Sequence, residues 1–368
     1  MSNVVIIGAG RTGRGYIARQ ISTRENSLVF IDKNEELVRN LREQRELEIS
    51  YYGNPSKKTK ITGYQAYQSD TEDAKNAIAQ ADYIFTSVGE QNLIEVGKLI
   101  KSTLKMRNLN KKQRIITGEN GISPKQKLLE VLTEKEYEIS EAIIFCTTNP
   151  KNKIDILSEE LDFLPYDIVP LSSELPFCNF VAEEKFHDLL QRKIYTYNCL
   201  SACISYLGDC MGYENYGQAA NDPFILDIMT KLKNQLTKAL SKKYSIEEEE
   251  QDHFGNMAIK KFTNMEIEDS VVRNARNARR KLGPEERILA PLKILQENGQ
   301  DTTILCLMAA AAMCFGCKKE NMDIKQIKFM VNENAKKRNI ENVEKIIQYF
   351  DELMNSKNKG QYLKKYSL

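Results

Sequence analysis

The sequence predicts an α/β fold, in which a doubly wound parallel sheet is followed by an all-α C-terminal domain. Apolar strands alternate with helical segments from the N-terminus to about residue 150, a pattern typical of a parallel sheet with helices on both faces. After Glu183 the pattern becomes almost entirely helical. With 368 residues the chain is long enough for two domains, which we place at residues 1–180 and 181–368.

The elements of the first domain follow from apolar runs and their spacing. Strands are expected at residues 4–7, 27–31, 82–87, 114–117 and 142–146, and helices at 16–21, 35–43, 73–79 and 93–104. Residues 51–67 are expected to be irregular or a hairpin. In the second domain, Asn221-Asp222-Pro223 is a capped helix start with proline in the first turn. Helices are expected there at 183–212, 221–244, 246–262, 285–296, 302–315, 324–337 and 343–354.

The composition excludes several classes of protein. Hydrophobic residues make up 41% of the chain, charged residues 28%, and the net charge is only +2. Such a balance gives no general attraction to nucleic acids or to membrane surfaces. No apolar run approaches the roughly 18 residues of a membrane helix, and the first strand begins too early for a signal peptide. We expect a cytoplasmic protein with a small-molecule substrate, either a monomer or a homodimer.

The cysteines and histidines argue against a metal site. The eight cysteines lie mostly within apolar helical patterns, as reduced thiols do. Cys314 and Cys317 form a C-x-x-C pair, but a zinc site would also need a second pair or spare histidines. The chain has only two histidines, so we expect no metal.

A glycine-rich turn follows the first strand. Gly8-Ala9-Gly10-Arg11-Thr12-Gly13 matches the G-x-G-x-x-G fingerprint of a Rossmann-type dinucleotide-binding domain, in its usual place between strand and helix. Gly8 permits the tight turn, Gly10 lets a pyrophosphate approach the backbone, and Gly13 lets the helix pack on its strand. Arg11 and Thr12 lie at the helix start, where free N–H groups bind phosphates. An ordinary tight turn is the alternative.

An acidic residue ends the second strand. Asp32 lies about 20 residues after the glycines, where a carboxylate bonds a ribose hydroxyl and repels a 2′-phosphate. The sequence therefore favours NAD over NADP as cofactor, although Lys33 would partly offset that repulsion. Two further strands end at a common sheet edge, where a nicotinamide and its substrate would lie. The residues at these strand ends are Thr86, Val88, Gly89, Glu119 and Asn120.

Polar residues interrupt the long helix that opens the second domain. At about 100° per residue, Lys193, Asn198 and Ser201 share one broad face of this helix. A lysine is more often found on a solvated surface. A lysine desolvated beside a nicotinamide cation would instead have a lowered pKa and could serve as a general base.

With these residues in view, the chain resembles the polyol-specific long-chain dehydrogenases. The resemblance depends on the glycine turn, residues 86–89, Glu119-Asn120, residues 192–198, and the stretch from Arg273 to Arg287. It implies that Lys193 takes the alcohol proton while a hydride moves to the cofactor, and that Asn198 and Asn120 form an oxyanion hole. The family's histidine, which orients substrate hydroxyls, falls on Ser201, and the family's Asp-Arg pair before Val-Pro is absent.

The segment from Arg273 to Lys281 carries five cations in nine residues. Arginine is suited to bidentate phosphate contacts, so Arg273, Arg276 and Arg280 are candidate ligands of a sugar phosphate. A solvated basic face is the alternative. We expect an NAD-dependent oxidoreductase that interconverts a sugar alcohol, such as a hexitol phosphate, and its ketose. An NAD-binding sensor of the same fold, or a dehydrogenase of another sugar-derived substrate, remains open.

Overall fold

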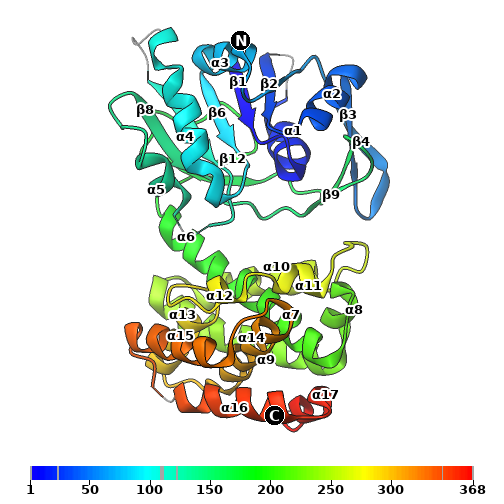
Figure 1. Cartoon of the computed structure of the whole chain (residues 1–368), viewed down its shortest axis with the longest axis vertical. Coiled ribbons are helices and arrows are strands. Elements are labelled where there is room, and N and C mark those ends of the chain that lie inside the picture. The colour runs from blue at the N-terminus through cyan, green and yellow to red at the C-terminus, as the bar shows by residue number, and fades with distance from the viewer. Residues whose placement is uncertain (1, 23–24, 108–111, 122, 342, 367–368) are drawn as a thin grey trace. The chain divides into compact units, whose positions relative to one another are not determined.

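The computed structural model describes residues 2–22, 25–107, 112–121, 123–341 and 343–366. It divides into two compact units, Met1–Leu190 and Gln191–Leu368 (Figure 1). The first unit contains all the strands among the described residues, and the second contains helices.

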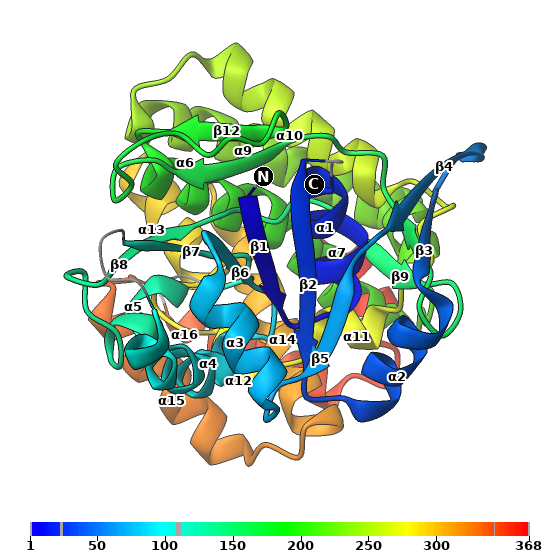
Figure 2. The same ribbon diagram turned by 90° about the horizontal axis from the view of Figure 1, so that it is seen from above.

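A six-stranded parallel sheet forms the centre of the first unit, as predicted. Its strands lie in the order β5-β2-β1-β6-β7-β8 (Figure 2). Alternate residues of β1 point to opposite faces, so that Val4 and Ile6 belong to one buried cluster and Val5 and Ile7 to the other. The strands are β1 (Ser2–Ile7), β2 (Asn26–Asp32), β5 (Gln65–Gln68), β6 (Tyr83–Thr86), β7 (Gln113–Thr117) and β8 (Tyr137–Glu141). The helices connecting them are α1 (Ala18–Ile21), α2 (Glu35–Gln44), α3 (Glu72–Gln80), α4 (Leu93–Ser102) and α5 (Pro124–Leu129).

The last strand of this sheet was misplaced by the sequence pattern. The paired segment is Tyr137–Glu141, and the more apolar residues 142–146 leave the sheet. Tyr137 and Ile139 pack into one core while Glu138 pairs with Arg114, as suits an edge strand with alternating faces. Residues 142–146 instead place Ala142, Ile144 and Cys146 in the core on the other side of the sheet. Burial without strand pairing therefore explains their apolar character.

Two smaller sheets complete the first unit. A hairpin is present, but it begins before the expected residues 51–67: it is formed by β3 (Glu46–Tyr51) and β4 (Asn54–Thr62). It continues into β10 (Ile156–Ser158) and β9 (Thr148–Pro150), in the order β4-β3-β10-β9. A separate parallel pair joins β11 (Leu164–Asp167) and β12 (Phe180–Glu183).

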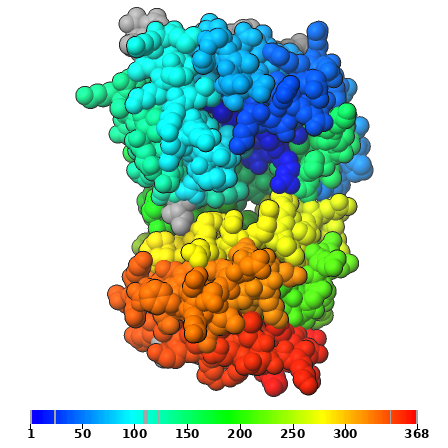
Figure 3. Space-filling view, viewed as in Figure 1, coloured from blue at the N-terminus to red at the C-terminus, as the bar shows by residue number. Residues whose placement is uncertain are grey.

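The second unit is built around one buried helix. Residues 304–316 of α14 (Thr303–Lys319) are all buried, which explains why this apolar run carries no helical alternation. The helices coloured orange to red form much of the surface of this unit in Figure 3. The unit contains α7 (Cys199–Met211), α8 (Tyr216–Asn221), α9 (Pro223–Tyr244), α10 (Glu248–Phe262), α11 (Val271–Ala275), α12 (Ala278–Lys281), α13 (Leu289–Glu297), α14, α15 (Ile324–Lys337), α16 (Val343–Asn355) and α17 (Lys359–Lys364).

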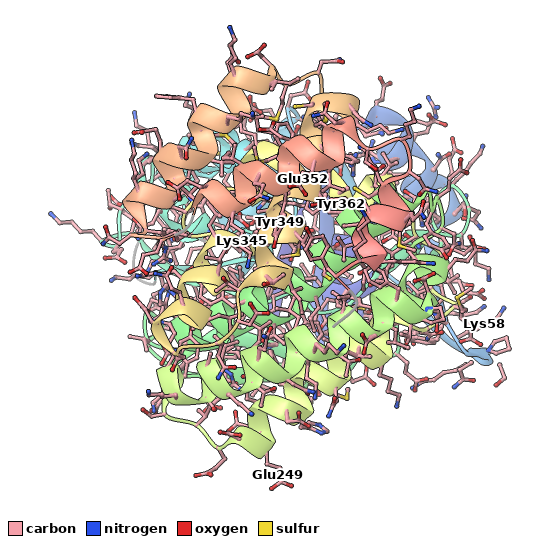
Figure 4. The ribbon with its side chains drawn as sticks, turned by 90° about the horizontal axis from the view of Figure 1, so that it is seen from below. Lys58, Glu249, Lys345, Tyr349, Glu352 and Tyr362 are labelled. Atoms are coloured by element: carbon pink, nitrogen blue, oxygen red, sulfur yellow. The ribbon has the colours of Figure 1, made fainter. Side chains whose placement is uncertain are left out.

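Local contacts fix the ends of several helices. Asp222 caps α9 as expected, because its side chain accepts hydrogen bonds from the N–H groups of Phe224 and Ile225. At the C-terminal end, the Tyr362 hydroxyl donates to Glu352 at 2.6 Å and fastens α17 to α16 (Figure 4). None of the eight cysteines forms a disulfide. Among the described residues, no helix is long and apolar enough to cross a membrane.

Candidate active site

The glycine turn of the first unit has the close packing that the fingerprint requires. Gly8 has a φ of +95°, and a Cβ at this position would overlap the carbonyl of Ser87. A Cβ on Gly13 would overlap the carbonyl of Gly8, so the helix start lies directly against the turn. A Cβ on Gly10 would meet nothing within 4 Å. The backbone at Gly10 therefore faces open space, as a pyrophosphate site needs.

Arg14, which is not among the site residues predicted from the sequence, holds this turn through hydrogen bonds to backbone carbonyl groups. Its side chain is buried, and Nε donates to the carbonyl of Ile154 at 3.0 Å. Another of its nitrogens donates to the carbonyl of Ala9, inside the turn itself. Arg11 lies on the exposed side and bonds Asn149 at 3.2 Å, and the half-buried Thr12 precedes the helical turn. The only sequence signal for Arg14 is its place directly after the fingerprint.

Asp32 ends β2, next to β1 in the sheet. One of its carboxylate oxygens, Oδ1, accepts the N–H of Asn34 at 2.9 Å. Within the described residues, the other oxygen accepts no hydrogen bond and remains available to a ligand. Asp32 lies at the carboxyl end of β2, which is the position expected for a carboxylate that hydrogen-bonds a ribose hydroxyl.

Glu119 organises the carboxyl ends of β6 and β7. Its buried carboxylate accepts the N–H groups of Val88 and Gly89, each at 2.8 Å. Burial raises the pKa of this carboxyl group. Glu119 therefore holds the loop after Thr86 in place. The structure thus brings Thr86, Val88, Gly89 and Glu119 together, and the exposed Asn120 follows at the same edge.

In the second unit, the helix carrying Lys193 is not regular. Phe186–Lys193 is α-helical, Ile194–Asn198 forms a π turn, and Cys199–Met211 resumes the α-helix. A π turn holds more residues than an α turn, so the rotation calculated for a regular α-helix does not apply across it. A second π turn, Gly13–Ile17, lies at the glycine fingerprint. Such turns occur frequently at functional sites.

Lys193 is buried, with 7% of its surface exposed. Burial lowers the pKa of its ammonium group from an ordinary 10.5 to about 7. Arg287 and Lys261 lower this pKa further through charge repulsion, and Glu286 raises it. The amine is consequently near the midpoint of its titration at neutral pH, as a general acid or base requires.

Among the groups that shift the pKa values of Lys193 and Lys281, cations outnumber acids. The basic cluster consists of Lys193, Lys261, Arg280, Lys281 and Arg287. The buried Glu286 accepts from Arg280 at 2.7 Å and from Arg287 at 3.0 Å. Glu320 is a second acid that acts on this cluster, because its charge raises the pKa of Lys281. The cluster therefore favours an anionic ligand.

Lys281 is a second buried amine in this cluster. It donates to the carbonyl of Asn274, and burial lowers its pKa to about 7. The site residues predicted from the sequence do not include Lys281, Lys261, Glu286 or Arg287. Lys281 and Arg287 do lie in the stretch that carries the family resemblance.

The three arginines predicted for phosphate binding have different surroundings. Arg280 lowers the pKa of Lys193 through charge repulsion, and it donates a hydrogen bond to Glu286. Arg273 pairs with Asp269 at 3.0 Å, and the exposed Arg276 donates to the backbone carbonyl of Arg273 at 3.3 Å. Neither Arg273 nor Arg276 is among the groups that shift the pKa of Lys193.

Ser201 and Asn198 are both half-buried on the Lys193 helix. Asn198 ends the π turn, and Ser201 follows one α-helical turn later. The Ser201 hydroxyl accepts a hydrogen bond from Tyr216 at 3.0 Å. Among the described residues, no group of three or more His, Cys, Asp or Glu side chains is placed to hold a metal ion.

Comparison with known proteins identifies related chains and folds. Mannitol-1-phosphate 5-dehydrogenase of Thermoanaerobacter pseudethanolicus is 28% identical over 344 residues, 87% of each chain. That of Clostridium acetobutylicum is 27% identical over 362 residues, 92% of this chain and 93% of its own. The structure of Pseudomonas fluorescens mannitol 2-dehydrogenase, solved with NAD and D-mannitol, has a TM-score of 0.74 at 12% identity. It covers 99% of this chain, and 94% of that chain is matched.

A substrate-free D-sorbitol dehydrogenase shares the fold with a TM-score of 0.76 at 11% identity, covering 97% and 94% of the two chains. The Rossmann domain of mannitol dehydrogenase matches residues 2–192, and the mannitol dehydrogenase C-terminal domain matches residues 185–361. These matches confirm the resemblance predicted from the motifs. The chain belongs to the mannitol dehydrogenase family of oxidoreductases.

Proposed function

We propose that this protein is an NAD-dependent dehydrogenase that interconverts a hexitol phosphate, such as mannitol 1-phosphate, and the corresponding ketose phosphate. The observation that carries this proposal is the buried Lys193, whose pKa of about 7 arises beside Arg280 and Arg287. The amine provides acid–base chemistry, and the arginines favour an anionic substrate. The mannitol-1-phosphate 5-dehydrogenases among the relatives support the phosphorylated substrate.

The first unit has the features that NAD requires. Open space at Gly10, the tight contacts of Gly8 and Gly13, and the available oxygen of Asp32 fit a pyrophosphate and a ribose. The N–H groups at Arg11 and Thr12 would hold the phosphates, and the loop from Thr86 to Gly89, fixed by Glu119, would lie along the nicotinamide. When bound, NAD supplies the acceptor for the hydride in alcohol oxidation.

Lys193 is the proposed general base in alcohol oxidation and the general acid in ketone reduction. In alcohol oxidation the neutral amine accepts the proton of the substrate hydroxyl, so an N–H bond forms as the O–H bond breaks. In ketone reduction the ammonium returns that proton to the new hydroxyl oxygen. Asn198 and Asn120 would donate hydrogen bonds to the developing alkoxide, as the family resemblance implies. Asn198 ends the π turn that begins directly after Lys193.

Arg280 and Arg287 are proposed to bind the substrate phosphate. Both already bond Glu286, which holds their guanidinium groups in place. A phosphate dianion would accept charge-assisted hydrogen bonds from them. Arg273 and Arg276 stay predicted phosphate ligands, and the assay described below includes them.

Replacing Asp32 tests the cofactor assignment. Asp32→Ser keeps an oxygen for the N–H of Asn34 and removes the charge that repels a 2′-phosphate. Calorimetry should show that the parent binds NADH more tightly than NADPH, and that the variant loses most of this preference. Glu35→Gln, which changes an exposed acid in the first turn of α2, is the matched control. Equal affinities in the parent protein would contradict the role given to Asp32.

The pH dependence of turnover tests Lys193. Because the neutral amine is the base, the rate of alcohol oxidation should rise with pH through about 7, and ketone reduction should fall over the same range. Lys193→Met should lower kcat by about 10²–10⁴-fold and remove that limb of the profile. Lys260→Met, at an exposed lysine of α10, should leave both unchanged.

Removing the Lys193 amine should also raise the melting temperature, because methionine is better suited to a buried position than an ammonium. This separates loss of chemistry from loss of folding. A Lys193→Met variant that turns over as fast as the parent would place the base elsewhere. A parent that binds NADH but turns over no sugar or sugar phosphate would favour a non-catalytic sensor.

Arginine variants test the phosphate. Arg280→Gln and Arg287→Gln should each raise KM for the phosphorylated substrate by about 10–100-fold, the worth of a charged hydrogen bond. KM for the unphosphorylated sugar should barely change. Arg279→Gln, at the exposed neighbour of Arg280, is the control, and Arg273→Gln and Arg276→Gln test the two remaining arginines. Equal effects on both classes of substrate would mean that the cluster is structural.

A further inference from the structure

Tyr216 and Ser201 form a hydrogen-bonded pair beside the Lys193 helix. The Tyr216 hydroxyl donates to Ser201 Oγ at 3.0 Å. Tyr216 begins α8, just after the N-cap Asn215, and is 6% exposed. Its ring packs edge-on against Phe262 with centroids 6.0 Å apart. The tyrosine is therefore held by packing, and its hydroxyl is aimed at one serine.

The direction of this hydrogen bond determines what Ser201 can offer. Burial raises the pKa of Tyr216 above its ordinary value of 10, so the phenol remains a protonated donor at neutral pH. Ser201 Oγ is its acceptor. A serine hydroxyl has one proton of its own to donate. Among the described residues, that proton finds no acceptor, and Ser201 is half-buried rather than fully solvated.

Resting on the proposed function, we propose that Tyr216 positions Ser201 as a hydrogen-bond donor that selects sugars carrying an acceptor oxygen next to the reacting carbon. Ser201 follows Asn198 by three residues, which is about 4.5 Å along a helix axis. Asn198 is the group proposed to bond the reacting oxygen. Neighbouring oxygens of a sugar chain are closer together than this rise. Two side chains that converge slightly from these positions can therefore each contact one of two adjacent oxygens.

This pairing gives Ser201 a defined chemical role where the family resemblance places a histidine. A serine hydroxyl is uncharged at every relevant pH, so its contribution does not titrate. With Tyr216 occupying an acceptor site, the hydroxyl keeps one proton that it can donate to a ligand. Ser201 is thus the specificity-determining residue, and Tyr216 is a positioning residue that acts through it.

A comparison of sugar analogues tests the pair. The substrates are the ketose phosphate and two analogues, each lacking one of the hydroxyls that flank the carbonyl. The parent should lose up to about 10-fold in kcat/KM with one of the analogues, the worth of one hydrogen bond. Ser201→Ala should abolish this difference, and Tyr216→Phe, which keeps the ring on Phe262, should reduce it. KM for NADH and the pH profile attributed to Lys193 should not change in either variant.

The double variant separates a positioning role from a structural one. Tyr216→Phe added to Ser201→Ala should have no further effect on discrimination, because the tyrosine acts only through the serine. Tyr213→Phe, which removes the hydroxyl that bonds Asp222 at 2.8 Å, is the matched control and should leave discrimination intact.

Additive effects in the double variant, or equal discrimination by parent and Ser201→Ala, would overturn this inference alone. A parent that turns over none of the three substrates would overturn the proposed function and this inference together.

Discussion

An ammonium group is unstable when it is buried, and more so beside guanidinium groups, and these two effects set the chemistry of Lys193 and Lys281. Lys193 and Lys281 both lie near Arg280 and Arg287, and Glu286 and Glu320 are the acids that offset part of this repulsion. Each buried lysine has a pKa near 7, below its ordinary value of 10.5. Between those two pH values the unfolded chain binds protons that the folded chain does not, so the free energy of unfolding decreases as the pH falls from 10.5 towards 7. Chemistry near neutral pH is thereby obtained at the expense of stability.

The first unit contributes through its backbone rather than its charges. The turn at Gly8, Gly10 and Gly13 needs positions without side chains, and the buried Arg14 and Glu119 hold the adjoining loops by bonding main-chain groups. Each unit has its own π turn, one beginning at Gly13 and one directly after Lys193. Local departures from regular helix therefore coincide with the residues proposed to bind the cofactor and to move the proton.

Much of this could be predicted from the sequence, because the strongest signals are local. The glycine fingerprint, the acid at Asp32 and the cap at Asp222 depend on a few consecutive residues. The strand at Tyr137–Glu141 was missed because burial outside a sheet makes residues 142–146 equally apolar. The partners of Lys193 lie about 70–95 positions away in sequence, and no local pattern reveals which cations meet it. Likewise, the sequence shows only that Ser201 stands where the family has a histidine. The hydrogen bond that it accepts from the Tyr216 hydroxyl is visible only in the structure.

Lys193 is proposed to lose its proton near neutral pH, and NMR of the side-chain nitrogens in lysine-labelled protein follows this titration at the amine itself. Following these resonances with pH should show two amines that titrate near 7, because Lys281 shares the cluster. Spectra of Lys193→Met and Lys281→Met, in which one resonance disappears in turn, would assign them. A Lys193 resonance with a midpoint near 7 is the predicted result. A midpoint near its ordinary value of 10.5 would contradict the account, because the amine would then be fully protonated at neutral pH and could not accept the substrate's proton.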